Sequence, residues 1–154
     1  MTDTTSARPL LCSCVVHATF QSPRPSPRRP AVLLVDDDPA ITALVSRWLR
    51  RHRQAQVHIA HDGPTAIQLV ATQTVDAVFS DVELLDENGV DLIRVLGVVA
   101  PTLPLCLMSA KMSREQALRA HCVRVTSFVA KPLTSAMLVD RLDAMLQAPS
   151  FTPR

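Results

Sequence analysis

Residues 31–40 read Ala-Val-Leu-Leu-Val-Asp-Asp-Asp-Pro-Ala, and this stretch decides the fold class. Its five consecutive apolar residues are too few for a helix and suit a short strand that is covered on both faces. Asp38 and Pro39 then supply a helix N-cap and the first helical position, so Asp38 is expected to cap a helix rather than bind a metal. A covered strand that leads directly into a helix predicts an α/β fold.

The same alternation of strand and helix recurs along the rest of the chain. Further short apolar runs lie at Val57–Ala60, Val75–Ser80, Leu105–Met108 and Ser127–Ala130. Helical patterns lie at 39–49, 64–73, 90–99, 113–121 and 134–147. Because each helix carries the chain back across the sheet, the strands run parallel. We therefore expect a doubly wound five-stranded parallel sheet, a flavodoxin-like (βα)5 fold with strand order 2-1-3-4-5.

Apolar residues at helical spacing predict which side of three helices faces the core. The residues expected inside are Ile41, Leu44, Val45, Trp48, Leu49, Leu92, Ile93, Leu96, Val99, Leu138, Leu142, Met145 and Leu146.

Composition limits the class of protein. Of the 154 residues, 47% are hydrophobic and 19% are charged, which is typical of one globular domain. Four Arg and one Asp occur in residues 1–30, whereas residues 31–154 hold twelve Lys or Arg and thirteen Asp or Glu. The folded part is therefore not basic, and nucleic acid is not an expected partner. No run approaches the roughly 18 apolar residues of a membrane span, so no membrane is expected either.

The domain organisation follows from a change in composition near residue 30. Residues 21–30 contain four prolines, which favour an extended chain. We expect a disordered Pro/Arg-rich N-terminal leader over 1–30, one domain over 31–147 and a short C-terminal tail over 148–154. The four cysteines form no disulfide framework, which fits the cytoplasm, and Cys106 is expected to be a small buried hydrophobe.

Polar side chains stand where four of the predicted strands end. The carboxyl ends of parallel strands meet at one edge of the sheet, where such folds bind ligands. The groups at these ends are Asp36 and Asp37, then Asp81, Ser109 and Lys131. Three carboxylates at close range repel unless a cation intervenes, and their oxygens suit Mg²⁺. Asp81 could then attack phosphorus as a nucleophile, with Lys131 neutralising the charge on the phosphoryl oxygens and Ser109 donating a hydrogen bond.

Over about residues 31–147 the chain resembles the receiver domains of bacterial response regulators. The matching motifs are Leu34-Val35-Asp36-Asp37, Asp81, Gly89, Met108-Ser109-Ala110 and Phe128-Val129-Ala130-Lys131-Pro132. The resemblance implies a receiver of a two-component phosphorelay, of the stand-alone single-domain type. Leu84-Leu85 departs from the Met-Pro that often follows the acceptor in this family, and this change removes no reacting group.

The same resemblance implies a role for each site residue. Four groups would bind Mg²⁺, namely the carboxylates of Asp36, Asp37 and Asp81 and the backbone carbonyl of Glu83. Asp81 would be the phospho-acceptor, and Lys131 would pair with the phosphoryl group. Ser109 would move toward that group as a switch residue, and Phe128 would turn inward as the aromatic switch residue.

The resemblance also implies the partners. A histidine kinase or a histidine phosphotransfer protein would donate the phosphoryl group, and the chain would catalyse only its own phosphorylation and dephosphorylation. With no output domain visible, the signal would reach a downstream protein effector through the face formed by the fourth helix, fifth strand and fifth helix, about 112–147. We expect a cytoplasmic monomer or a weak phosphorylation-dependent dimer. Glu83 and Lys111, each two residues beyond a site residue, are expected to pair across the entrance and slow hydrolysis.

Three alternatives stay open at this point. The first is a phosphorylation-independent interaction module with the same fold, although such a module needs neither the acidic pair nor Lys131. The second is a metal-dependent hydrolase of phosphate esters, which would need a covering cap that the short loops do not supply. The third is a DNA-binding regulator, for which no helix-turn-helix pattern is visible.

Overall fold

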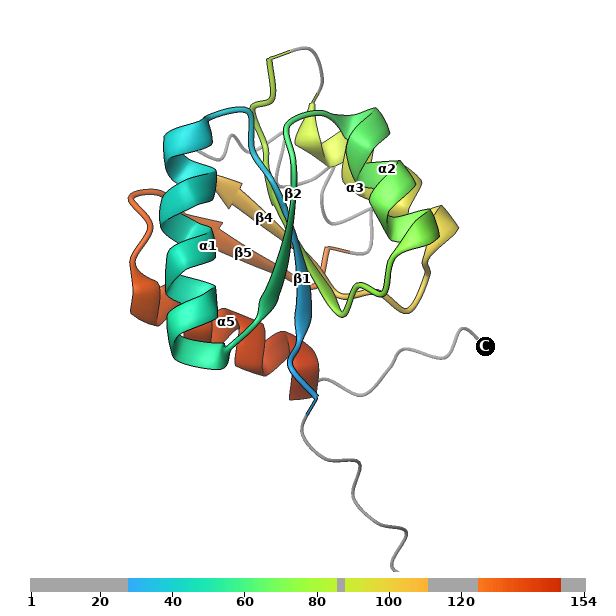
Figure 1. Ribbon diagram of the computed structural model, residues 1–154. Coiled ribbons are helices and arrows are strands. Elements are labelled where there is room, and N and C mark those ends of the chain that lie inside the picture. Colours follow the sequence, from blue (N-terminus) through green and yellow to red (C-terminus); the bar gives the residue numbers. More distant parts are fainter. Residues whose placement is uncertain (1–27, 86–87, 111–124, 148–154) are drawn as a thin grey trace, which may run out of the picture.

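The structure is a computed structural model that describes residues 28–85, 88–110 and 125–147 (Figure 1). Its strands are β1 (Ala31–Val35), β2 (Gln56–Ala60), β3 (Ala77–Asp81), β4 (Leu105–Ser109) and β5 (Ser127–Ala130). They pair in parallel in the order β2-β1-β3-β4-β5. The helices are α1 (Pro39–Arg53), α2 (Gly63–Thr72), α3 (Gly89–Val99) and α5 (Ser135–Gln147). The predicted doubly wound sheet and its strand order are confirmed.

Several predictions concern parts of the chain outside these described residues. They are residues 1–27 of the expected leader, Lys111, the helix expected over 113–121 and the C-terminal tail over 148–154. In the part of the chain that the structure does describe, no helix combines the length and the apolar character that a membrane crossing requires.

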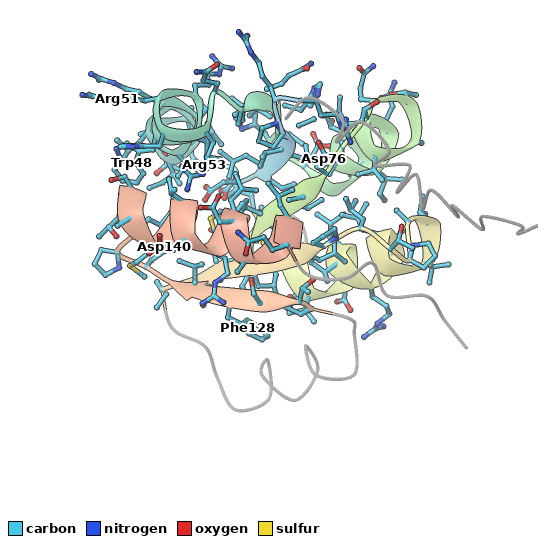
Figure 2. All side chains as sticks on the ribbon, turned by 90° about the horizontal axis from the view of Figure 1, so that it is seen from below. Trp48, Arg51, Arg53, Asp76, Phe128 and Asp140 are labelled. Carbon is cyan, nitrogen blue, oxygen red and sulfur yellow. The ribbon has the colours of Figure 1, made fainter. Side chains whose placement is uncertain are left out.

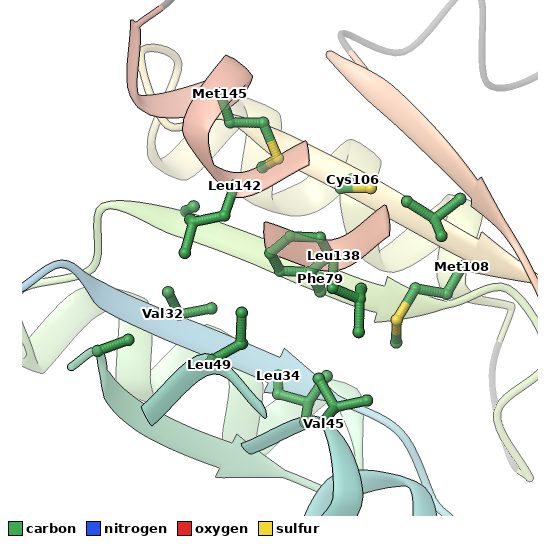
Figure 3. Packing of buried hydrophobic residues seen from close by; sticks show 13 residues of the cluster. Val32, Leu34, Val45, Leu49, Phe79, Cys106, Met108, Leu138, Leu142 and Met145 are labelled. Carbon is green, nitrogen blue, oxygen red and sulfur yellow. The ribbon is translucent and has the colours of Figure 1, made fainter. Parts of the chain in front are cut away.

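The sheet is covered on both faces, with α1 and α5 on one side and α2 and α3 on the other (Figure 1). Successive residues of a strand point to opposite faces, so the core forms two clusters. Leu33, Val78 and Leu107 face α2 and α3. Phe79 and Leu34 face α1 and α5, as the packing in Figure 3 shows. Burial on both sides explains why β1, β3 and β4 are mainly apolar, whereas the edge strand β2 is partly exposed.

Helix α1 begins as its sequence predicts. The Asp38 carboxylate accepts a hydrogen bond from the Ala40 backbone N–H at 2.8 Å, and Pro39 occupies the first turn. Asp38 is therefore confirmed as the N-cap. At its C-terminal end α1 contacts α5, because the Arg53 Nε donates to the Asp143 Oδ1 at 2.6 Å.

The predicted inward faces were wrong at three positions. Leu44, Val99 and Leu146 are 42%, 48% and 41% exposed. In α1 the buried stripe is instead Thr42, Val45, Ser46 and Leu49, at i, i+3, i+4 and i+7. The hydroxyls of Thr42 and Ser46 donate to carbonyls of their own helix, so both can be buried at little cost and the helix turns Leu44 outward. In α3 and α5 the exposed residues flank stripes that end at Leu96 and Met145.

Contacts with the domain extend three residues before Ala31. The Asp76 carboxylate, ahead of β3, pairs with Arg28 and accepts the Ala31 N–H at 2.8 Å (Figure 2). The backbone adds two bonds, from Asp76 N–H to the Ala31 carbonyl at 2.7 Å and from Gln56 N–H to the Pro30 carbonyl at 2.9 Å. Asp76 thus fixes the start of β1 against the start of β3.

Replacing Asp76 with alanine should lower the free energy of unfolding by about 1–3 kcal/mol, because the Ala31 N–H loses its acceptor. Urea denaturation measures the change. Asp76→Asn keeps an acceptor oxygen and should lose less. Arg28→Ala removes only the exposed ion pair and should cost under about 1 kcal/mol. An Asp76→Ala protein as stable as the parent would contradict the assignment.

Candidate functional site

The carboxyl ends of four strands bring the predicted polar groups to one edge of the sheet. Asp36 and Asp37 follow β1, Asp81 ends β3, Ser109 ends β4 and Lys131 follows β5. Each of Asp36, Asp37 and Asp81 offers a carboxylate oxygen, and these oxygens lie within 4.8 Å of one another. The register of the parallel strands places these groups side by side. At the end of β4 and β5, for example, the backbone N–H of Lys131 donates to the Ser109 carbonyl at 2.8 Å.

Lys131 supplies the positive charge beside these carboxylates. Its Nζ lies 2.8 Å from the Asp81 Oδ2 and 3.1 Å from the Asp36 Oδ2. Burial of the ammonium lowers its pKa, but the hydrogen bonds and charges of Asp81 and Asp36 outweigh that effect, and the pKa is raised. Lys131 therefore carries its charge throughout the physiological pH range.

Asp36 is held rigidly and is fully buried. Its Oδ1 accepts the Asp38 N–H at 2.9 Å, and its backbone N–H donates to the Ala60 carbonyl at 3.2 Å. Burial raises the pKa of this carboxyl and the charge of Asp81 adds to the rise, against the opposing effects of the Asp38 N–H and Lys131. One ammonium thus compensates the three carboxylates only in part, and the cluster is suited to a further cation.

The carbonyl of Asp81 lies against Gly89, the first residue of α3. The Gly89 N–H donates to the Val82 carbonyl at 2.9 Å, and the Ser80 hydroxyl donates to the Asp81 carbonyl at 3.0 Å. A Cβ atom at position 89 would lie 1.8 Å from the Asp81 carbonyl oxygen. Glycine is therefore required here by a close backbone approach, which the sequence motif alone does not reveal.

The remaining predicted site residues lie in different surroundings. Ser109 is buried at the end of β4. Glu83 is exposed and forms an isolated antiparallel bridge with Asn88. Phe128 is half-buried in β5, at the position Figure 2 labels, and packs against the cluster that faces α2 and α3. Cys106 is buried as predicted, and burial raises the pKa of its thiol to about 11.

His61 makes a contact with Asp36 that the sequence did not predict. Its Nδ1 lies 2.9 Å from the Asp36 carbonyl oxygen. The histidines share no common spacing, so none of them was expected to take part in the site. One feature could have indicated the contact. His61 directly follows β2, β2 pairs with β1, and the acidic pair Asp36 and Asp37 directly follows β1.

The donor set fits a magnesium ion. Hard dications prefer oxygen ligands, and Mg²⁺ is held by one or two carboxylates together with water and phosphoryl oxygens. Asp36, Asp37 and Asp81 offer only oxygen, and these oxygens lie close together at one edge of the sheet.

Comparison with known proteins supports the same assignment. A family model of the response regulator receiver domain matches residues 32–143. The probable transcriptional regulatory protein TcrX of Mycobacterium tuberculosis is 34% identical over 121 residues, which are 79% of this chain and 51% of TcrX. Chemotaxis protein CheY-3 of Vibrio cholerae is 28% identical over 118 residues, 75% of this chain and 91% of CheY-3.

A solved structure agrees with the fold. The signal receiver domain of an HD domain-containing protein from Pseudomonas fluorescens Pf-5 has a TM-score of 0.74 and 25% identity, and the match covers 79% of this chain and 90% of that one. The chain spans about half the length of the transcriptional regulators it matches. Receiver domains are signalling modules of two-component systems. On the match to residues 32–143, the chain belongs to the response regulator receiver family.

Proposed function

We propose that this domain accepts a phosphoryl group on Asp81 from a histidine kinase or a histidine phosphotransfer protein. One observation carries the proposal. The Asp81 carboxylate ends a buried strand, lies 2.8 Å from the Lys131 ammonium and shares a cluster with two further carboxylates. A nucleophilic carboxylate, a fixed cation and a set of metal ligands are the parts that phosphoryl transfer to an aspartate requires.

Asp36, Asp37, Asp81 and the backbone carbonyl of Glu83 would hold Mg²⁺, which supplies positive charge for the phosphoryl oxygens when it is bound. Lys131 lies at the same cluster and would pair with another of these oxygens. Ser109, at the end of the neighbouring strand, would donate a hydrogen bond to the phosphorylated product.

The transfer step exchanges one bond to phosphorus for another. A carboxylate oxygen of Asp81 forms the new P–O bond while the P–N bond of the donor phosphohistidine breaks. The electron pair of that bond stays on the imidazole nitrogen, which takes up a proton from solvent. Dephosphorylation ends the signal. Water attacks phosphorus, the P–O bond to Asp81 breaks and inorganic phosphate leaves. The domain catalyses these two steps on itself.

Phosphorylation would add a charge of about −1.5 to −2 beside Ser109 and Lys131. This charge shifts an existing equilibrium between two conformations of the domain. Ser109 and Phe128 are the proposed switch residues, and residues 112–147 form the proposed face for a downstream protein effector. We propose a cytoplasmic monomer or weak phosphorylation-dependent dimer, in which this domain contacts neither nucleic acid nor membrane.

The test is direct labelling with a small phosphodonor such as acetyl phosphate and Mg²⁺. Intact-mass spectrometry should detect one added phosphoryl group that hydroxylamine removes. EDTA or Asp81→Asn should abolish it. Asp91→Asn, on the exposed face of α3, is the matched control and should label like the parent. A parent protein that takes no label on Asp81 would instead support the phosphorylation-independent interaction module.

A further inference from the structure

Where β2 ends, a side chain takes the place of the backbone N–H that would otherwise pair with the residue after β1. The Asp36 N–H donates to the carbonyl of Ala60, the last residue of β2, at 3.2 Å, which continues the parallel ladder one residue beyond β1. In a regular parallel ladder the Asp36 carbonyl would next accept the N–H of residue 62. Asp62 instead opens α2 as its N-cap, and its carboxylate accepts the Thr65 N–H at 2.7 Å. The side chain of His61 contacts the Asp36 carbonyl in place of that backbone donor.

The His61 ring must be the donor in this contact. A backbone carbonyl oxygen can only accept, so the hydrogen lies on Nδ1 of His61, 2.9 Å away. Asp36 is then fixed at its N–H, at its carbonyl and at both carboxylate oxygens. The peptide that joins Asp36 to Asp37 is consequently held in one orientation.

We infer that His61 is a positioning residue, whose Nδ1–H fixes the Asp36–Asp37 peptide so that Asp37 presents its carboxylate to Mg²⁺. The inference rests on the proposed function. Asp37 follows this peptide directly, is half-buried and contributes one of the three clustered oxygens. Groups that orient metal ligands from outside the ligand set change metal affinity when they are removed.

Two substitutions separate the donor from the bulk of the ring. Asparagine carries an N–H₂ group at the same number of bonds from the backbone as the histidine Nδ1, so His61→Asn can keep the bond. His61→Leu fills similar space without a donor. Loss of one hydrogen bond that orients a ligand should weaken Mg²⁺ binding about threefold to tenfold in the leucine variant. The asparagine variant should stay within about twofold of the parent.

The measurement is isothermal titration of the unphosphorylated protein with MgCl₂, together with thermal unfolding in EDTA to verify that each variant folds. His52→Leu, on the exposed end of α1, is the matched control and should bind as the parent does. Should the leucine variant fail to fold, His61→Ala takes its place under the same criterion.

Equal Mg²⁺ affinity in the leucine variant and the parent would overturn the inference. Equal weakening in the leucine and asparagine variants would overturn it as well, because the donor would then play no part. Neither result affects the proposed function. A parent protein that does not bind Mg²⁺ at all would overturn both.

Discussion

Gly89→Ala should disrupt the proposed phosphorylation site, although it adds only a single methyl group. We expect the free energy of unfolding to fall by about 1–3 kcal/mol or more, and labelling of Asp81 by acetyl phosphate to slow at least about tenfold. The new Cβ would lie 1.8 Å from the Asp81 carbonyl oxygen and 2.9 Å from its carbonyl carbon. Both are backbone atoms of Asp81, the proposed acceptor, so the clash can be relieved only by moving Asp81 or the start of α3.

Gly97 provides a matched control for this substitution. It lies in the same helix, and a Cβ there would meet nothing within 4 Å. Gly97→Ala should therefore raise the free energy of unfolding by about 0.4–1 kcal/mol, because alanine has less conformational freedom in the unfolded chain. Urea denaturation and the rate of acetyl phosphate labelling measure both variants. If Gly89→Ala matched Gly97→Ala in stability and in labelling rate, the close approach of Gly89 to the Asp81 carbonyl would not matter for folding or for labelling.

The fold was predictable because its determinants are local. Five short apolar runs, each followed by a helical pattern, leave few arrangements other than a parallel sheet covered on both faces. The same pattern predicts the convergence of Asp81 with Asp37 and Lys131, because polar groups at the carboxyl ends of parallel strands share an edge. The regular features of the chain therefore predicted which of these side chains the structure brings together.

The missed features depend on geometry that no sequence pattern carries. The rotation of α1 that exposes Leu44 follows from hydroxyls that bond within the helix. The need for glycine at position 89 arises from a backbone carbonyl eight residues earlier in the chain. The contact of His61 with Asp36 depends on where β2 ends relative to β1. In each case the partner is a backbone carbonyl. Every residue has one, so the amino-acid sequence does not indicate which carbonyl makes the contact.

Lys131→Met should give the second large effect, and the size of its loss of stability should depend on Mg²⁺. In EDTA near neutral pH we expect the free energy of unfolding to fall by up to about 3–5 kcal/mol, since Asp36 and Asp81 lose the ammonium that they share. The loss should be smaller than the upper figure because the Lys131 side chain is 20% exposed and water can partly replace it. Urea denaturation with and without Mg²⁺ measures the effect.

Magnesium should restore much of the stability of Lys131→Met, because the ion would supply positive charge to the carboxylates that have lost the ammonium. Binding to the folded state stabilises it in proportion to the logarithm of the ligand concentration, so the variant should gain more from added Mg²⁺ than the parent does. Phosphorylation of Asp81 should nevertheless stay slow, because the phosphoryl oxygens lose a partner that the metal does not replace. Lys131→Arg keeps the charge, and Arg47→Met removes an exposed charge of α1 as the matched control.

The pH dependence of this effect has a defined sign. The folded state raises the pKa of Lys131, so the stability that its ammonium contributes is present below the ordinary lysine pKa and is lost as the pH rises through the folded-state value. The stability difference between parent and Lys131→Met should thus be constant above neutral pH and shrink only in strongly alkaline solution. At acidic pH it should shrink too, because the pKa of the Asp36 carboxyl is already raised and a proton can replace the missing cation. A difference that is unchanged by Mg²⁺ and by pH would show that the carboxylates do not depend on Lys131 for compensation of their charge.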